Sequence, residues 1–241
     1  MSLTYEDQGT GRTVLLLHGG AGPRSVLPFA QRLATGARVI VPTHPGFDDT
    51  PGGPAGVGDL AEQYLALLDE LGLGGVAVIG NSIGGWIAAE MAVRDTGRRL
   101  DRLVLVGAVG IAVPDHPVAD FFALDFAELA QRSYANPDAF RIDPAALTDA
   151  QRATMAGNRR AIAHYSGPHE MADPGLRARL RDVAVPTLAL WGESDRIVDP
   201  DYGRAYAAAI PGATFVLLPG TGHLPLIETP DQVLEVLDQH L

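Results

Sequence analysis

The sequence predicts an α/β fold, with a twisted, mostly parallel sheet, helices on both of its faces and an all-helical insertion. Short apolar runs alternate with helical patterns along most of the 241 residues, which is typical of βαβ units around a parallel sheet. The alternation stops between residues 112 and 184, where helical patterns follow one another without a convincing strand. We therefore expect one core from residues 1–111 and 185–241, with residues 112–184 inserted as a helical cap, or lid.

Seven short segments are predicted to be the strands of the core. The first covers residues 3–6 and ends before a glycine-rich turn. The others are apolar runs, as expected of strands that are buried on both faces. In chain order they cover residues 13–17, 37–41, 76–79, 102–106, 187–191 and 214–218.

Helical periodicity and capping residues predict the elements between the strands. Ser25 is expected to cap a helix that runs to about residue 34. Asp59 is expected to begin an amphipathic helix with Leu60, Tyr64 and Leu68 on its apolar stripe. The remaining predicted helices cover residues 85–92, 201–209 and 230–240 in the core, and 118–131, 148–165 and 174–181 in the insertion.

Composition and charge argue against several classes of function. The net charge is −11 and the chain contains no lysine, which disfavours binding to nucleic acid or to anionic membranes, because both need basic patches. The absence of cysteine excludes disulfides and thiolate chemistry. No apolar run is long enough to span a bilayer, and no signal segment follows Met1. We expect a cytoplasmic protein that acts on a small molecule, as a monomer or a homodimer.

The segment Gly80-Asn81-Ser82-Ile83-Gly84 lies between a predicted strand and a predicted helix, which is the context of a nucleophile elbow. So sharp a turn forces its serine into strained backbone dihedrals, and only small residues leave room for the neighbouring chains. The turn would expose Ser82 Oγ and place the amide of Ile83 at a helix N-terminus, where a developing anion is stabilised. Taken alone, the motif fits an ordinary glycine-rich turn equally well.

A serine nucleophile needs a base, and the base needs a third group that holds its tautomer and orientation. His223 follows the last predicted strand and is our candidate for the base. Asp195 follows the strand before it and is our candidate for the orienting acid, with Glu193 and Asp199 as rivals. The order Ser82, acid, His223 is the order of an elbow-type triad, and the carboxyl ends of parallel strands meet at one edge of the sheet.

An oxyanion hole would complete the site. We expect one donor to be the amide of Ile83 and the other to come from the loop after the second strand. Gly20 is the preferred donor there and Ala21 is its rival. His18 is expected to be a structural member of the same loop.

These motifs together resemble the α/β-hydrolase superfamily over nearly the whole chain. The resemblance rests on His18-Gly19-Gly20, His44-Pro45-Gly46-Phe47, the elbow, Gly192-Glu193-Ser194-Asp195 and Gly222-His223, in this order. It implies the α/β-hydrolase fold, a cap that roofs the active site, and catalysis without a metal or other cofactor. The short amino end implies that the first antiparallel strand of the usual eight is missing or vestigial.

The leading functional hypothesis is a serine hydrolase that cleaves a small ester, lactone or thioester. Apolar cap residues such as Phe121, Phe122 and Tyr165, together with Leu224, are candidates for substrate binding, although most cap residues are expected to serve ordinary packing.

Two alternatives stay open. The elbow resembles that of meta-cleavage-product hydrolases, which cut carbon–carbon bonds in dienoates, with Arg159 or Arg160 as a candidate for gripping a carboxylate. Those enzymes usually carry tryptophan after the catalytic histidine, where this chain has Leu224. A ligand-binding receptor on a hydrolase scaffold is the other alternative.

Overall fold

The computed structural model describes residues 3–140, 143–167 and 171–240. Within this part of the chain, seven strands form one sheet in the order β1-β3-β2-β4-β5-β6-β7. The edge strand β1 runs antiparallel to β3 and all other pairs are parallel, which confirms the predicted fold. The strands are β1 (Tyr5–Gly9), β2 (Thr13–Leu17), β3 (Arg38–Pro42), β4 (Val76–Asn81), β5 (Leu100–Val106), β6 (Thr187–Gly192) and β7 (Thr214–Leu218).

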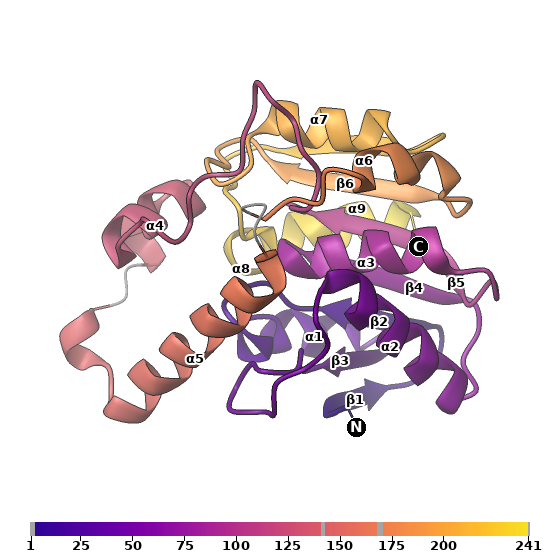
Figure 1. The fold of residues 1–241 in the computed structure, drawn as a ribbon, viewed down its shortest axis with the longest axis horizontal. Helices are drawn as coiled ribbons and strands as arrows, with labels where there is room; N and C mark the ends of the chain where they lie inside the picture. Colours follow the sequence, from indigo (N-terminus) through magenta and orange to yellow (C-terminus); the bar gives the residue numbers. More distant parts are fainter. Residues whose placement is uncertain (1–2, 141–142, 168–170, 241) are drawn as a thin grey trace.

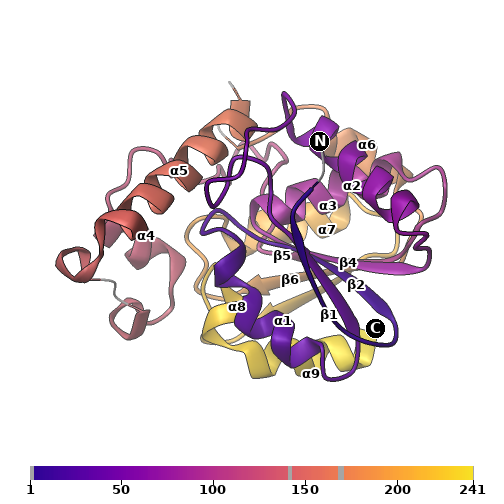
Figure 2. The same cartoon turned by 90° about the horizontal axis from the view of Figure 1, so that it is seen from below.

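Helices cover both faces of the sheet (Figure 2). Side chains alternate between the faces, so that in β2 Val14 and Leu16 belong to one buried cluster and Leu15 and Leu17 to the other. The first cluster is completed by α1 (Leu27–Leu33), α8 (Pro225–Glu228) and α9 (Pro230–His240). The second is completed by α2 (Val57–Glu70), α3 (Ile83–Arg94), α6 (Leu176–Arg179) and α7 (Pro200–Ala208).

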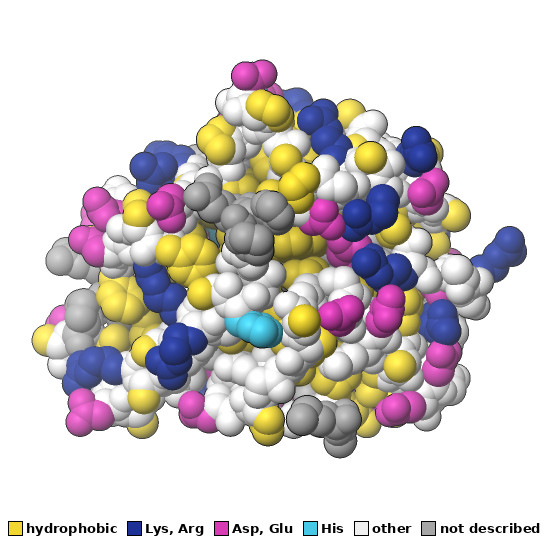
Figure 3. Space-filling model, in the orientation of Figure 1, with side chains coloured by type: hydrophobic (Ala, Val, Ile, Leu, Met, Phe, Trp, Pro, Cys, Tyr) yellow, Lys and Arg dark blue, Asp and Glu magenta, His cyan; other side chains and the backbone are white. Residues whose placement is uncertain are grey.

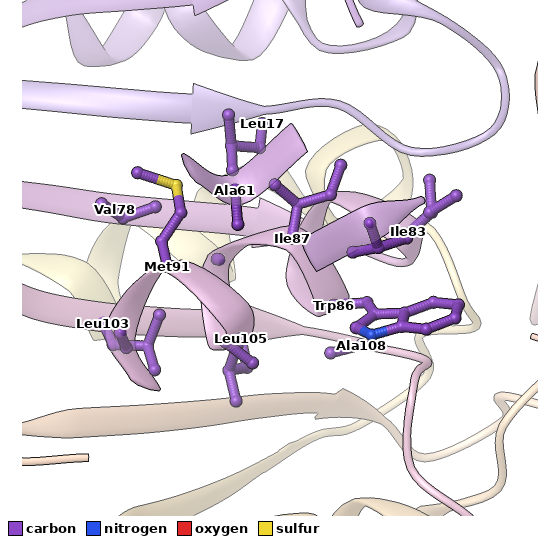
Figure 4. Close-up of a cluster of buried hydrophobic side chains, with 14 of the residues drawn as sticks. Leu17, Ala61, Val78, Ile83, Trp86, Ile87, Met91, Leu103, Leu105 and Ala108 are labelled. Carbon is purple, nitrogen blue, oxygen red and sulfur yellow. The ribbon is translucent and has the colours of Figure 1, made fainter. Parts of the chain in front are cut away.

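Helix α3 is the centre of the second cluster. Its residues Ile83, Trp86, Ile87 and Met91 lie among side chains of β4, β5 and α2 (Figure 4). Nearly every residue of α3 is buried. The helix that follows Ser82 is therefore fixed on all sides, and it gives the elbow a rigid support.

Part of the segment between β5 and β6 projects beyond the carboxyl ends of the parallel strands (Figure 1). Helix α4 (Phe126–Ser133) begins with a capping box formed by Asp125 and Glu128, and α5 (Asp149–Ser166) begins with one formed by Thr148 and Gln151. Short 3₁₀ turns join them at Pro137–Phe140 and Pro144–Ala146. At the far end, Leu176 and Leu180 are buried in the core cluster. The division into core and cap at residues 112 and 184 stays a prediction.

Three local predictions need correction. The helix expected over residues 118–131 begins only at Phe126, because the Asp120 carboxylate accepts hydrogen bonds from the amides of Phe122 and Ala123 and holds a turn there. The Ser25 hydroxyl donates to the carbonyl of Gly22 in a 3₁₀ turn and caps no helix. The first strand extends to Gly9, not to residue 6.

This longer first strand has a simple cause. Its polar residues are exposed at the sheet edge, and the Asp7 carboxylate pairs across to Arg38 of β3 at 2.6 Å. Such a cross-strand ion pair stabilises polar residues in an edge strand, although strand propensity disfavours aspartate.

Candidate active site

Ser82 occupies the turn between β4 and α3 with φ 54° and ψ −116°. Few residues other than glycine adopt this conformation, and such strain is typical of functional positions. The glycines of the motif leave the room that the turn needs. A β-carbon on Gly80 would lie 2.2 Å from the carbonyl oxygen of Gly84, and one on Gly84 would lie 2.4 Å from that of Leu17. The local sequence therefore folds as an elbow because larger residues cannot occupy these positions.

The structure brings the three predicted side chains into one hydrogen-bonded chain. Nε2 of His223 lies 3.0 Å from Ser82 Oγ, and Nδ1 of the same ring lies 2.8 Å from Asp195 Oδ2. All three residues are buried, with Ser82 8% exposed. With its Nδ1 proton donated to the carboxylate, His223 presents an unprotonated Nε2 to the hydroxyl, which is the arrangement a general base requires.

The rival acids lie elsewhere. The other oxygen of Asp195 accepts hydrogen bonds from the amides of Ile197 and Val198, which fix its carboxylate. Glu193 accepts from the amide of Gly220, and Asp199 caps α7 and accepts from the ring of His116. Asp195 is thus the carboxylate placed to orient His223.

Two further residues join the loops of the site, and sequence reasoning missed both of them. The side-chain amide of Asn81 donates to the carbonyl of Val106 at 3.1 Å and to that of His223 at 3.5 Å. Gly107, just after β5, adopts φ 51°, and a β-carbon there would lie 3.2 Å from His223 Nδ1. The only sequence signals were the position of Asn81 inside the elbow and a glycine directly after a buried strand.

The predicted oxyanion donors lie in the two segments next to the nucleophile, since Ile83 follows Ser82 and a β-carbon on Gly19, the residue before Gly20, would lie 3.3 Å from Ser82 Cβ. Ile83 is the first residue of α3, so its amide points out of the helix N-terminus. Within the described residues, neither the Ile83 amide nor the amides of Gly20 and Ala21 donate to another protein atom. Gly20 is closely covered by the insertion, since a β-carbon on it would lie 2.6 Å from Cδ1 of Ile162.

A buried histidine pair supports this loop. Nε2 of His18 accepts from the amide of His44, so its Nδ1 carries the proton that is donated to the carbonyl of Gly19. The two rings stack with 3.7 Å between their centroids. In turn, Nε2 of His44 lies 2.9 Å from the carbonyl of His18, and Nδ1 lies 2.5 Å from the hydroxyl of Tyr64.

Both rings of this pair are neutral. Burial lowers the pKa of His18 to about 4, and burial together with the neighbouring His18 lowers the pKa of His44 well below its ordinary value. Both ring nitrogens of His18 are thus used within the protein, and the ring that faces Ser82 is that of His223.

Helix α5 contacts the loops after β2 and β3. The side-chain oxygen of Asn158 accepts a hydrogen bond from the backbone amide of Asp48, and its side-chain amide donates to the Asp48 carboxylate. The same side-chain amide also donates to the carbonyl of Ala21 at 3.5 Å. The hydroxyl of Tyr165 donates to the carbonyl of Pro45 at 2.9 Å, and burial raises its pKa to about 12. Tyr165 was predicted to contact the substrate, but its hydroxyl is hydrogen-bonded within the protein.

The other predicted substrate contacts are less constrained. Phe121 and Phe122 are half-buried and pack against the core cluster that contains Ile83. Leu224 is half-buried directly after His223, and it is found in neither core cluster of the described residues.

Arg159 contacts the segment that contains Phe121 and Phe122. Its guanidinium donates to the carbonyls of Phe121, Phe122 and Leu124 and lies over the rings of both phenylalanines. The guanidinium is therefore directed towards the backbone of this segment.

No cluster of three or more histidine, aspartate or glutamate side chains that would suit a metal ion occurs among the described residues. None of the helices in that part of the chain has the length and apolar character needed to cross a membrane.

Comparison with known proteins decides the family. The model of the alpha/beta hydrolase family matches residues 14–236. The chain belongs to this family. It is 30% identical to 2-hydroxy-6-oxononadienedioate/2-hydroxy-6-oxononatrienedioate hydrolase 2 of Pseudomonas putida, over 92% of this chain and 85% of that protein.

Two other similarities are informative. The chain is 27% identical to a 2-hydroxy-6-oxo-6-phenylhexa-2,4-dienoate hydrolase of Burkholderia cepacia, over 90% of this chain and 83% of that protein. Among solved structures, a thermophilic esterase from Thermogutta terrifontis superposes with a TM-score of 0.77 at 29% identity, covering 99% of this chain and 92% of the esterase. The protein is therefore a hydrolase, with relatives named for two different reactions.

Proposed function

We propose that this α/β hydrolase cleaves a small, mainly apolar ester, lactone or thioester through an acyl-enzyme on Ser82, without a cofactor. The observation that carries the proposal is the hydrogen-bonded chain from Ser82 through His223 to Asp195. A strained serine with a base and an orienting acid already within hydrogen-bond distance is equipped for nucleophilic acyl transfer.

The first half of the reaction forms the acyl-enzyme. Ser82 Oγ attacks the substrate carbonyl carbon while His223 Nε2 takes the hydroxyl proton. The carbonyl oxygen becomes an oxyanion, which accepts hydrogen bonds from the amides of Ile83 and Gly20, with Ala21 as the alternative donor. Each such donor contributes about 3 kcal/mol to transition-state stabilisation. Collapse of this intermediate breaks the bond to the leaving group, which departs as an alcohol or thiol after taking the proton from His223.

The second half releases the acid. A water molecule gives its proton to His223 Nε2 and attacks the acyl carbon, and the new oxyanion is held by the same amides. Collapse then breaks the bond to Ser82 Oγ, which recovers its proton from His223. Asp195 stabilises the imidazolium in both halves without becoming protonated itself.

The surroundings support an apolar small-molecule substrate. Ile162 approaches the oxyanion loop, and Phe121 and Phe122 pack towards the cluster that includes Ile83. On the face shown in Figure 3, arginine side chains are interspersed with carboxylates. Elsewhere in the structure, Arg99 pairs with Asp69 and Arg179 pairs with Asp173. No extended basic surface is visible on the face in Figure 3, which fits the proposal that nucleic acid and membranes are not partners.

Carbon–carbon bond hydrolysis is the second candidate, and the names of the Pseudomonas and Burkholderia relatives favour it. The same triad would serve. Two observations weigh against it in this chain: one guanidinium nitrogen of Arg159 already donates to backbone carbonyls, and Leu224 follows His223. Arg160 remains as a cation for a substrate carboxylate, although it lines a surface pocket with Asp49 and His164.

The two reactions are separated by one substrate panel. We expect the wild-type protein to release nitrophenol from short p-nitrophenyl esters and Ser82→Ala to release none above background. A yellow meta-cleavage dienoate should keep its colour. If the dienoate is bleached faster than esters are cleaved, the second candidate is correct. If neither changes while a small apolar ligand still binds, the protein is a receptor and the proposal is wrong.

A further inference from the structure

The carboxylate of Glu228, at the end of α8, joins two segments that are far apart in the sequence. Oε2 accepts a hydrogen bond from the amide of Gly222 at 2.6 Å, and Oε1 accepts one from the amide of Ala135 at 2.8 Å. Gly222 immediately precedes His223, and Ala135 follows α4 of the insertion. The half-buried side chain of Glu228 therefore connects the loop that carries His223 to the helical segment between β5 and β6.

A backbone contact runs beside this bridge. The amide of His223 donates to the carbonyl of Ser133, the last residue of α4, at 2.6 Å. The fit is tight, since a β-carbon on Gly222 would lie 2.3 Å from the Ser133 carbonyl oxygen and 2.8 Å from Glu228 Oε2. The position of His223 is thus set directly by the end of α4.

The last turn of α4 also binds the loop that carries Asp195. The amide of Arg196 donates to the carbonyl of Arg132, and the guanidinium of Arg196 donates to that of Gln131. His223 and Asp195, the other two members of the hydrogen-bonded chain, therefore lie on loops that are hydrogen-bonded to the last turn of α4. Each of these loops also has a side-chain contact with this stretch, through the guanidinium of Arg196 in one loop and the carboxylate of Glu228 in the other.

A carboxylate is the group that this bridge requires. It offers acceptors on both oxygens, whereas the amide of glutamine offers one acceptor and one donor. A glutamine here would turn an N–H towards the amide of Gly222 or of Ala135 and leave that amide unsatisfied, which costs more than the loss of an average hydrogen bond.

We propose that Glu228 is a positioning residue for His223, holding the imidazole within reach of Ser82 by fastening its loop to the end of α4. The role rests on the proposed function of His223 as the base. The Glu228 bridge couples the position of α4 to the position of His223. If α4 is displaced, the His223 amide loses its partner and Glu228 loses one of its two partners.

The test compares Glu228→Gln with wild type, using Glu235→Gln as the matched control because Glu235 is an exposed carboxylate on α9. With a short p-nitrophenyl ester, Glu228→Gln should lower kcat by ~10- to 100-fold, the effect of a small misplacement of a catalytic group, with little change in KM. Glu235→Gln should match wild type in both parameters. A raised KM with an unchanged kcat would overturn the proposal, because that result describes a pocket defect.

A second measurement is independent of turnover. Proton NMR should show a far-downfield signal from the His223 Nδ1 proton shared with Asp195, assigned by its loss in Asp195→Ala. We expect Glu228→Gln to shift or broaden this signal while its far-UV circular dichroism stays that of the wild type. An unchanged signal overturns the positioning role even if the wild type cleaves no ester. If wild type cleaves no ester and the signal still responds, the proposed function fails and the positioning role stands.

Discussion

Gly107 faces the imidazole of His223 so closely that a β-carbon on it would lie 3.2 Å from Nδ1 and 3.4 Å from Asp195 Oδ2. The hydrogen bond between the predicted base and its acid therefore passes directly over a glycine. That glycine has φ 51°, in the left-handed region that favours residues without a side chain. The small size of this residue leaves room for the ring and the carboxylate, and its backbone conformation is one that glycine adopts without strain.

Gly107→Ala should therefore impair both stability and catalysis. The left-handed conformation alone costs about 1–2 kcal/mol for alanine, and the new methyl group should displace the ring and lower kcat by ~10- to 100-fold. Gly72→Ala is the matched control, because Gly72 has φ 65° with open space around its β-position. It should lose similar stability in urea unfolding and keep its kcat. Equal kcat values for the two variants would show that Gly107 has no influence on His223.

Asp195→Asn should lower kcat by about 10⁴-fold, because asparagine no longer fixes the imidazole tautomer or stabilises the imidazolium. Glu193→Gln is the control, since Glu193 is a nearby acid whose carboxylate accepts a hydrogen bond from the amide of Gly220. Steady-state kinetics on one ester measures both variants. A larger loss in Glu193→Gln than in Asp195→Asn would reverse the assignment of the acid.

The sequence was sufficient for those features that local pattern encodes. Strands buried on both faces are continuous apolar runs, and the elbow needs glycines at fixed offsets from Ser82, so both could be read directly. The choice of Asp195 over Glu193 and Asp199 followed from chain order and loop position. The structure adds the reason, since Ile197 and Val198 hold the Asp195 carboxylate through their amides.

Contacts between distant residues could not be read in this way. Glu228 and Ala135 are 93 positions apart, and Asn81 reaches across to the carbonyl of His223. Neither contact has a local signature. The predicted start of a helix at residue 118 was wrong, because the carboxylate of Asp120 competes for backbone amides in a way that periodicity does not describe.

The buried pair of His18 and His44 predicts a loss of stability in mild acid. The pKa of His18 is about 4 in the folded protein and near 6.5 in the unfolded chain, so only the unfolded chain takes up a proton between these values. The free energy of unfolding should be highest above pH 6.5 and fall by about 3 kcal/mol from this residue as the pH drops to about 4. His44 acts in the same direction.

Urea unfolding at a series of pH values measures this slope. His18→Asn should be less stable at neutral pH but show a shallower fall on acidification. His164→Gln, which changes an exposed histidine of α5, should keep the wild-type slope. The same slope in wild type and His18→Asn would mean that His18 is accessible to protons in the folded state.

The insertion should govern the choice of substrate more than the rate of the chemistry. Phe121→Ala and Phe122→Ala remove half-buried rings that pack against the core cluster, so we expect altered relative rates across p-nitrophenyl esters of increasing acyl length. Phe126→Ala is the control on the same segment, since its ring is 53% exposed. If all three variants keep the wild-type profile, these rings do not contact the acyl chain.

The role of Ser82 as the nucleophile is tested most directly by covalent labelling with a fluorophosphonate, read by intact-mass and peptide mass spectrometry. The probe needs only an activated serine and a base, so it works without knowledge of the natural substrate. We expect one adduct per wild-type chain, located on Ser82, much slower labelling of His223→Ala, and none of Ser82→Ala. Labelling of Ser82→Ala at the wild-type rate, or an adduct on another residue of the wild type, would contradict the assignment of the nucleophile.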